Sequence, residues 1–439
     1  MTPPDTIVAL SSGAGKAGIA VIRASGPGAA VCIRHLAGAD VPARRAVLRT
    51  LRNSPAGPAV DSGLVLWLPG PGSVTGEDVA EFQVHGSPAV VGRLLSVLCA
   101  LDGVRPAEPG EFTRRAFENG RMDLSGAEGL ADLIDAETEA QRIQAQRQME
   151  GAFAERCAGW GAQLRRSLAW LEAAIDFPDE ALPDDLAAQV RPAVEAVAAG
   201  LAGWLAAPDR GRMVREGYRV AIVGAPNVGK SLLNRIAQRD VAIVAETAGT
   251  TRDVIEVRAD LAGYAVVFAD TAGLRYDETA GDIEREGMAR ARFQAESADL
   301  VLHVVDAAAP AAGPPADVGA GPDRVLTVAN KTDLAPAPPD VPLGVSARTG
   351  AGIDGLLAAI EARTTAAMGA GEHPALTRLR HRQCLEDAAA ALERALAATE
   401  AELTAEDLRL ALRAMDRLIG RTDVEDLLDL IFRDFCIGK

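Results

Sequence analysis

The stretch RVAIVGAPNVGKSLLNRIAQRDVAIVAETAGTTRD, from Arg219 to Asp253, decides the fold of the middle of this chain. Val220–Val223 is a short apolar run that suits a buried strand, and Gly224–Ser231 fits the pattern G-x-x-x-x-G-K-[ST], with an apolar helical pattern after it. Strand, glycine loop and helix in this order present backbone N–H groups and a helix N-terminus to phosphate. We therefore predict a nucleotide site in which Lys230 reaches the β- and γ-phosphates and Ser231 binds Mg²⁺.

Three later motifs, each after a strand-like run, indicate that the nucleotide is GTP. Asp270-Thr-Ala-Gly273 places a carboxylate near the Mg²⁺ shell and a backbone N–H near the γ-phosphate. Asn330-Lys-Thr-Asp333 offers a carboxylate that can accept hydrogen bonds from the ring N–H and the amino group of guanine. Adenine lacks that pair of donors, so a buried unpaired carboxylate would disfavour ATP. Ser346-Ala347 suits a backbone contact to the guanine O6 atom.

The composition indicates a globular protein of two to four domains. The chain has 439 residues, of which 48% are hydrophobic and 24% charged, and it has no apolar run of 18 or more residues. Its start contains an acidic residue and no Lys or Arg before Lys16, which is atypical of a secretory signal. Five scattered cysteines show no metal spacing and suit a reducing cytoplasm. The net charge of −16 argues against a grip on RNA by this chain alone, so a basic partner or a local basic patch would have to supply it.

The first 120 residues are expected to be α+β. Strands are expected over 7–10, 18–22, 63–68 and 79–85, and alternation in the last of these puts Glu81 on a polar face. Such a face is usually a solvated one. A helix is expected from Ser87 as N-cap, with Pro88 at its first position, and another over 111–119.

Helical periodicity dominates on both sides of the nucleotide-binding region. Long helical stretches are expected within 127–177 and another helix over 186–206 with a kink at Pro192, followed by a polar link at 208–216. Near the C-terminus, Thr404 is expected to cap a helix and Thr422 to start the last one. A helical domain with a GTPase inserted into it explains this order as well as two separate helical domains do.

The position that normally carries a water-orienting glutamine in Ras-like proteins holds Leu274 here. Leucine cannot form the hydrogen bond, so another residue must position the water and another group must supply positive charge. Asn227 could recruit a cation for the second role. The acidic residues after Leu274, which include Glu284, are candidates for the first role, although most of them would simply be solvated.

The chain resembles the MnmE (TrmE) family of tRNA-modification GTPases over nearly its whole length. The resemblance rests on DTIVAL, GIAVIRASG, TGEDVAEFQVHG, RPAEPGEFTRRAFENGRMDL, ADLIDAET, AAIDFPDE, GAPNVGKS, AIVAETAGTTRD, DTAGLR with DIEREG after it, NKTD and the terminal FCIGK. It implies a multidomain α/β and α fold. Residues 1–120 would be a folate-binding and dimerisation domain similar to glycine-cleavage T-protein. Residues 121–215 with 370–439 would be a discontinuous helical domain, and 216–369 a Ras-like G domain with a mixed, mostly parallel sheet.

The same resemblance implies a GTP-hydrolysing enzyme of tRNA wobble-uridine modification. Such a homodimer works with the FAD protein MnmG (GidA), in a heterotetramer or larger complex, to add an aminomethyl-type or carboxymethylaminomethyl group at carbon 5. A 5-formyl- or methylene-tetrahydrofolate would supply the one-carbon unit, and K⁺-dependent pairing of G domains would stimulate hydrolysis. No membrane is implied. The alternative function is a ribosome-assembly or RNA-chaperone GTPase, which usually carries a basic RNA-binding module.

By position, the resemblance assigns Glu284 to orienting the attacking water, Ser231 and Thr251 to Mg²⁺, and a third set of residues to K⁺: Asn227, Ala245, Thr247 and Thr250. It assigns folate binding to Arg23, Glu81, Arg121 and Lys439, with Arg121 standing where many members have lysine. With the motifs above, the residues expected at GTP are Asn227, Val228, Gly229, Lys230, Ser231, Ala245, Glu246, Thr247, Ala248, Gly249, Thr250, Thr251, Asp270, Thr271, Ala272, Gly273, Asn330, Lys331, Asp333, Ser346 and Ala347.

Two features depart from simple expectation. Most family members read G-K-S-[ST]-L-L-N, whereas Ser231 is followed here directly by Leu232, one residue short, which could lower nucleotide affinity. Cys436, the fourth residue counted from the end, is expected to be packed beside the functional C-terminus, with a catalytic thiol as the alternative.

Overall fold

The computed structural model describes residues 5–54, 56–176, 184–206, 209–224, 228–239, 241–243, 256–270, 295–309, 321–369, 376–422, 425–433 and 435–438. These residues form two compact units. Unit 1 comprises 1–131, 154–165 and 409–439, and unit 2 comprises 132–153 and 166–408. Two long helices, α6 (Ala152–Asp176) and α13 (Ala401–Ile419), are each divided between the units. The expected three-domain boundaries remain a prediction.

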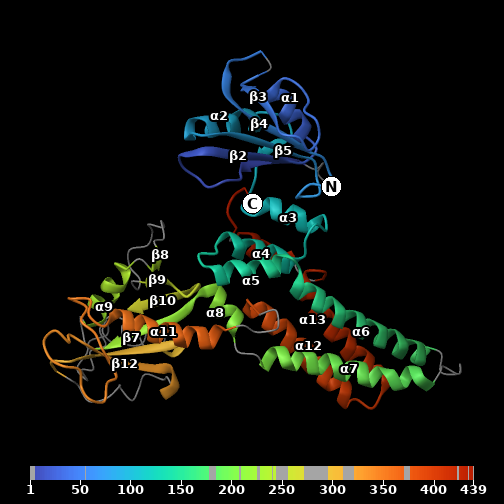
Figure 1. Cartoon of the computed structure of the whole chain (residues 1–439). Helices are drawn as coiled ribbons and strands as arrows, with labels where there is room; N and C mark the ends of the chain where they lie inside the picture. The colour runs from blue at the N-terminus through green and yellow to red at the C-terminus, as the bar shows by residue number, and fades with distance from the viewer. Residues whose placement is uncertain are drawn as a thin grey trace, which may run out of the picture. The chain divides into compact units, whose positions relative to one another are not determined.

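Unit 1 is built on a six-stranded sheet of order β3-β4-β5-β2-β1-β6. All neighbouring strands are antiparallel except β1 and β6, which are parallel. The strands and the two helices that pack on the sheet (Figure 1) are β1 (Thr6–Leu10), β2 (Ala17–Ser25), α1 (Ala29–Ala37), β3 (Val47–Arg52), β4 (Ala59–Leu68), β5 (Val79–Gly86), α2 (Pro88–Cys99) and β6 (Val104–Pro106).

Strand β5 shows how side chains alternate between the two faces of this sheet. Ala80, Phe82 and Val84 are 0%, 0% and 3% exposed and belong to the core that includes residues of α1 and α2. Burial of a phenylalanine such as Phe82 contributes about 2–3 kcal/mol. Glu81 and Gln83 alternate with these residues and are half-buried on the opposite face. The predicted period-two pattern is confirmed, and it leaves that opposite face for polar side chains.

Unit 1 also brings the two ends of the chain together. The helices α3 (Glu111–Glu118), α4 (Leu124–Ile134) and α14 (Glu425–Arg433) surround a small core of Leu124, Ala127, Leu428, Phe432 and Phe435. Beyond it, Ile437 bridges Pro109, and the Gly110 N–H donates to the Cys436 carbonyl at 3.4 Å. The C-terminal tail therefore lies beside the start of α3.

Unit 2 contains a seven-stranded sheet of order β13-β12-β11-β7-β10-β9-β8. Its first five strands are mutually parallel and the last two pair antiparallel, which confirms the mixed, mostly parallel sheet. The elements are β7 (Tyr218–Gly224), α9 (Val228–Ala237), β8 (Ala242–Ile243), β9 (Glu256–Leu261), β10 (Tyr264–Asp270), β11 (Leu300–Asp306), η1 (Pro322–Arg324), β12 (Val325–Asn330), β13 (Leu343–Gly344) and α11 (Ile353–Met368).

The remaining helices are α5 (Glu139–Met149), α7 (Asp184–Ala206), α8 (Arg210–Glu216) and α12 (Leu379–Ala397), with α7 packed against α12. Pro192 lies inside α7 as expected.

The helical stretches expected within 127–177 are α4, α5 and α6, which are separated near Thr138 and at Gly151, whose φ is +88°. Three other sequence expectations are wrong. The link at 208–216 is largely helix α8, which Arg212 stabilises by pairing with Asp209 and with Glu216. Thr404 caps nothing, because α13 already begins at Ala401. Cys436 is exposed, not packed, because it lies at the surface with Ile437, whereas Gly438 after them is buried.

Three smaller features complete the description of these elements. Ser87 is the N-cap of α2, but its side chain makes no capping hydrogen bond. His303 is a buried strand residue, 7% exposed. Among the described residues, no helix is both long and apolar enough to cross a membrane.

Candidate functional site

The glycine-loop context of the predicted GTP site is confirmed where the structure describes it. Strand β7 ends at Gly224 and helix α9 begins at Val228, with Ser231 exposed in its first turn. A Cβ atom at Gly224 would collide with the carbonyl of Val304 on β11, so this position requires the absence of a side chain. Leu232 and Ile236 are fully buried in the core under the sheet and fix the axis of α9.

Several predicted ligands lie outside the described residues. These are Asn227, the segment 244–255 with Ala245, Glu246, Thr247, Ala248, Gly249, Thr250 and Thr251, the turn Thr271, Ala272 and Gly273, and Glu284. The side chains of Val228, Lys230 and Asp270 also lie outside them, although their backbone is described. The water-positioning, K⁺ and second Mg²⁺ assignments therefore remain predictions.

The parallel strands carry the remaining motif residues to one edge of the sheet. In register, Asp270 of β10 lies opposite Ile222 of β7, and Asp306 of β11 lies opposite Asn330 of β12. Because the carboxyl ends of parallel strands meet at the same edge, these residues and Gly224 gather where ligands bind in open α/β sheets.

The best-defined part of this edge is the predicted guanine site. Asn330 is 2% exposed, and its Oδ1 accepts from the N–H of Lys331 at 2.7 Å and of Ala347 at 3.0 Å. This amide side chain therefore ties the loop after β12 to the loop after β13. Ser346 is fully buried and donates from Oγ to Asp333 Oδ1 at 2.6 Å. The two loops are held together by side chains that the motifs predicted.

The charges around this edge favour ionised carboxylates. The hydrogen bond from Ser346 holds the pKa of Asp333 below its usual value, and Arg348 pairs with its second oxygen, Oδ2, at 2.7 Å. The ammonium of Lys331, on a residue with φ +68°, donates to Asp306 at 2.6 Å and lowers the pKa of that carboxyl. The Ser346 hydroxyl thus orients Asp333 through Oδ1, and Oδ2 is a charged acceptor at the predicted guanine site.

The predicted folate residues Arg23 and Glu81 are brought together on the polar face of the unit 1 sheet. They are register partners on β2 and β5, and Arg23 Nε and Nη2 approach Glu81 Oε1 at 2.9 and 2.8 Å. Their side chains are 23% and 15% exposed, so the pair is accessible from solvent. The Arg23 guanidinium also lies 5.8 Å from the ring centroid of Phe112 on α3. Sequence reasoning missed Phe112, although it lies in the quoted family segment.

Arg121 and the C-terminal tail are fixed by close backbone approaches. Gly76, with φ +81°, faces the Arg121 side chain, whose Cγ would be 3.4 Å from an added Cβ. Gly438, with φ +96°, sits on the carbonyl of Leu10, next to Ala9, the register partner of Arg23. Lys439 lies outside the described residues, but its neighbour is held at the end of β1.

A charged network anchors α3 to this sheet and was not predicted from the sequence. Arg115, whose side chain is 11% exposed, pairs with Asp5 at 2.7 Å, Glu111 at 3.0 Å and Glu77 at 3.2 Å. Although burial raises the pKa of Glu111, hydrogen bonds from Arg105, the Glu108 N–H and Arg115 lower it further than burial raises it. The adjacent arginines of the segment 112–118 (FTRRAFE) indicated a charged cluster, but the partners Asp5 and Glu77 lie far away in sequence.

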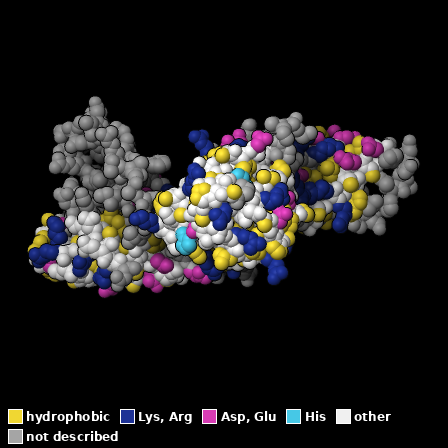
Figure 2. All heavy atoms as spheres, turned by 90° about the horizontal axis from the view of Figure 1, so that it is seen from above, with side chains coloured by type: hydrophobic (Ala, Val, Ile, Leu, Met, Phe, Trp, Pro, Cys, Tyr) yellow, Lys and Arg dark blue, Asp and Glu magenta, His cyan; other side chains and the backbone are white. Residues whose placement is uncertain are grey.

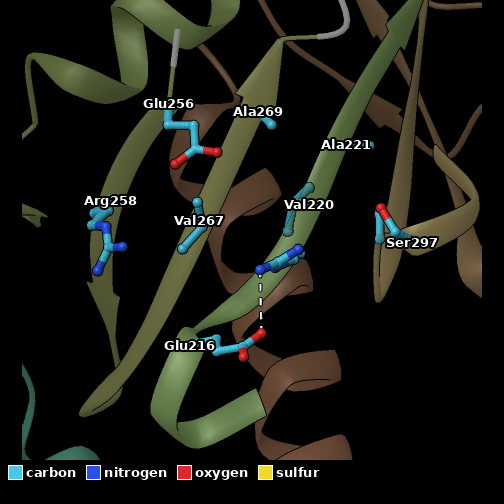
Figure 3. A pocket seen from close by; sticks show the side chains of 10 residues that line it. Glu216, Val220, Ala221, Glu256, Arg258, Val267, Ala269 and Ser297 are labelled. Atoms are coloured by element: carbon cyan, nitrogen blue, oxygen red, sulfur yellow. Dashed lines mark hydrogen bonds and ion pairs between the residues drawn. The ribbon is translucent and has the colours of Figure 1, made fainter. Parts of the chain in front are cut away.

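A separate pocket lies on the G-domain sheet away from the guanine site. Glu216, Arg219, Glu256 and Arg258 line it together with apolar residues of β7 and β10, and Figure 3 shows the ion pair of Glu216 with Arg219, at 3.2 Å. None of the predicted nucleotide residues lines this pocket. Arg258 also pairs with Glu137 at 2.9 Å, outside the pocket lining.

Comparison with known proteins decides the family. A model described as the GTP-binding protein TrmE N-terminus matches residues 6–121, and one described as the MnmE helical domain matches residues 124–436. The tRNA modification GTPase MnmE of Parvibaculum lavamentivorans is 55% identical, over 99% of this chain and 100% of its own length. This chain belongs to the MnmE family of tRNA modification GTPases.

A second curated relative agrees with this assignment. The tRNA modification GTPase MnmE of Rhodospirillum rubrum is 51% identical, over 99% of both chains. A solved structure of Aquifex aeolicus Era bound to GDP·AlF₄⁻ is 26% identical, over 42% of this chain and 68% of its own, with a TM-score of 0.26. Membership of the MnmE family confirms the expected GTP-hydrolysing enzyme with a Ras-like P-loop domain.

Proposed function

We propose that this MnmE-family chain hydrolyses GTP to drive the addition of an aminomethyl-type or carboxymethylaminomethyl group at carbon 5 of a tRNA wobble uridine. It acts as a cytoplasmic homodimer with MnmG, in a heterotetramer or larger complex, and the one-carbon unit comes from a tetrahydrofolate. The observation that carries the proposal is the pairing of Arg23 with Glu81 beside Phe112, because a guanine site alone would fit any Ras-like GTPase.

The residues on this face fit a folate. The pterin ring of a folate has an amide and amino edge that complements a carboxylate. Glu81 supplies the carboxylate and Arg23 supplies donors for a carbonyl, while the buried Phe112 lies under the Arg23 guanidinium and helps to position it. Arg121 and Lys439 would provide positive charge for the carboxylates of the folate tail. When bound, the tetrahydrofolate supplies the one-carbon unit.

The G domain provides selection for guanine and a surface for phosphate. Asp333 accepts from guanine while Ser346 holds its other oxygen, and the buried Asn330 fixes the distance between the two loops. The hydroxyl groups of Ser231 and Thr251 suit Mg²⁺, which prefers oxygen ligands. A K⁺ ion suits the side chain of Asn227 together with oxygens of Ala245, Thr247 and Thr250. This cation would supply positive charge for hydrolysis at a site where Leu274 replaces the usual glutamine.

A first experiment tests the cation and the water-positioning residue together. GTP hydrolysis by the purified chain is measured in KCl and in NaCl at equal ionic strength, with the Glu284→Ala variant beside it. The proposal expects stimulation specific to K⁺ and a loss of at least tenfold in the variant, in keeping with the usual contribution of a residue that assists proton transfer or positions water. Equal rates in the two salts would remove the K⁺ site.

A second experiment separates the proposal from a ribosome-assembly GTPase. Binding of 5-formyl-tetrahydrofolate is measured by equilibrium dialysis for the unvaried chain, Arg23→Ala and Arg114→Ala. Arg114 is a matched control on the same domain, because its ion pairs are to Glu118 and Asp429 and it lies outside the proposed site. Binding that is lost in the Arg23 variant alone supports the folate site, and the absence of folate binding would favour the rival function.

A further inference from the structure

The charge of the chain is unevenly distributed. Residues 1–120 contain eleven Lys and Arg and ten Asp and Glu, a net charge of +1 within a chain of net charge −16. The other residues therefore carry −17, and they repel a polyanion. A tRNA that approaches this chain meets its least unfavourable potential at the N-terminal domain.

Positive charge within this domain is concentrated at one edge of its sheet. From residue 41 to residue 60 there are four arginines and no Asp or Glu, and β3, the edge strand of the sheet, lies in this segment. A fifth arginine projects from α2 to the turn that follows β3. We call these five the β3 arginine strip: Arg44, Arg45, Arg49, Arg52 and Arg93.

The strip differs from the other arginines of the domain in its partners. Arg44 donates to the Gly72 carbonyl at 2.8 Å, Arg52 to the Gly57 carbonyl at 3.0 Å, and Arg93 to the Asn53 side chain at 2.8 Å. Within the part of the chain that the structure describes, no strip arginine forms an ion pair. The domain's other arginines all pair with carboxylates, namely Arg23, Arg34, Arg105, Arg114 and Arg115. The strip therefore keeps its charge available.

The hydrogen bonds also hold part of the strip together. Arg93 Nε contacts the side chain of Asn53, and His35 of α1 contacts the carbonyl of the same residue at 3.0 Å. Arg44, Arg45 and Arg93 are exposed, and the other two are half-buried. Figure 2, a view of the whole chain, shows Lys and Arg side chains on the surface together with hydrophobic, neutral and acidic ones.

Charged side chains on an edge strand have a simpler use, since they discourage pairing between sheets. That use needs only one or two charges of either sign. It accounts neither for the exclusion of acidic residues over a twenty-residue segment nor for the arginine from α2 at the end of the strip.

We propose that the β3 arginine strip binds the phosphate backbone of tRNA. The inference rests on the proposed function, because it assigns the RNA contact of that same protein. A six-residue strand spans about 20 Å, along which one strand of a nucleic-acid stem presents about six phosphates. Guanidinium groups suit this target because their planar donors match phosphate oxygens. The contact reads no sequence and orients the RNA.

The test is the salt dependence of tRNA binding by the full chain. Binding of an in vitro transcribed tRNA is followed by fluorescence anisotropy from 25 to 200 mM NaCl. The test variant is R45Q/R49Q/R52Q. The control variant, R142Q/R191Q/R394Q, removes the same charge from exposed arginines that pair with Glu139, Glu195 and Asp407 on helices of unit 2.

We expect the strip variant to lower the slope of log K against log salt by about two to three. Its affinity at 50 mM salt should fall more than tenfold, and the control should stay within threefold of the unvaried chain. GTP hydrolysis should be unchanged in both, which shows that they fold.

Equal slopes for the two variants would overturn the proposal. So would an absence of tRNA binding by the unvaried chain at 25 mM salt, or a strip variant that changes only the oligomeric state in sedimentation, which would make the strip an interface between copies. In each case folate binding and K⁺-stimulated hydrolysis would still test the proposed function separately.

Discussion

Replacing Asp333 by asparagine should move the nucleotide preference of the G domain from guanine to xanthine. The carboxylate is oriented by the Ser346 hydroxyl, 2.6 Å from Oδ1, while Oδ2 faces the partly exposed Arg348. Guanine would give this carboxylate two hydrogen bonds, from its ring N–H and from its amino group. The asparagine amide keeps an acceptor for Ser346, but it turns a donor towards the guanine amino group. Xanthine has a carbonyl oxygen there and would accept that donor.

The magnitude follows from the bonds exchanged. Hydrogen bonds to a charged group contribute about 1.5–3 kcal/mol each. Two of them lost, less a competing exposed pair with Arg348 that contributes at most about 1 kcal/mol, leave roughly 2–5 kcal/mol. The dissociation constant for GDP should therefore rise by about 30- to 4000-fold. The lost net charge also weakens the Ser346 bond, so the upper end of this range is expected.

The assay is a titration with fluorescently labelled GDP, competed by unlabelled GDP and by xanthosine diphosphate. Arg348→Ala is the matched control. Its guanidinium is 73% exposed, so its removal should change GDP affinity by less than fivefold. A change of less than tenfold in Asp333→Asn, or no gain for xanthosine diphosphate, would refute the placement of Asp333 at the guanine edge.

Further predictions concern unit 1. Gly438→Ala should weaken folate binding at least tenfold, because a Cβ there would push the tail off Leu10. The melting temperature should fall by no more than about 2–3 °C. Equilibrium dialysis measures the folate binding and calorimetry measures the melting temperature. Arg115→Gln should destabilise unit 1 by about 2 kcal/mol in urea unfolding, since it removes the ion pair of Glu77 and leaves Asp5 and Glu111 with Arg105 as their remaining shared partner. The folded-state pKa values of both carboxyls are lowered, so their stabilisation is present above about pH 4 and is lost as the pH falls below it. The variant's acid unfolding, followed by circular dichroism, should therefore begin at higher pH.

The nucleotide edge could be predicted from the sequence because its chemistry is local. Each motif follows directly on an apolar run, and the parallel sheet then brings the ends of these runs together without further information. Asn330, Asp333 and Ser346 accordingly lie where the motif order placed them. The period of two in β5 likewise sufficed to place Glu81 on the polar face, although its partner Arg23 required the resemblance to the family.

One helix boundary within 127–177 has a local signal that the apolar periodicity does not show. The side chain of Gln141 accepts from the Thr138 N–H at 3.0 Å, so a threonine followed three residues later by glutamine starts α5 there. At Thr404 the same type of pattern misled. There the hydroxyl donates to the Glu400 carbonyl at 3.1 Å, which is the back-bonding of a threonine already within a helical turn.

Long-range contacts set the limit of what the sequence can indicate. Arg115 meets Asp5 across 110 residues and Glu77 across 38, and neither spacing has a periodic signature. The same limit applies to the β3 arginine strip. The sequence lists its arginines, but only the contacts show that they find no carboxylate while their neighbours do. In a chain of net charge −16, a row of arginines that form no ion pair with the chain's own carboxylates indicates an external binding partner. A phosphate backbone matches these arginines in charge and in spacing.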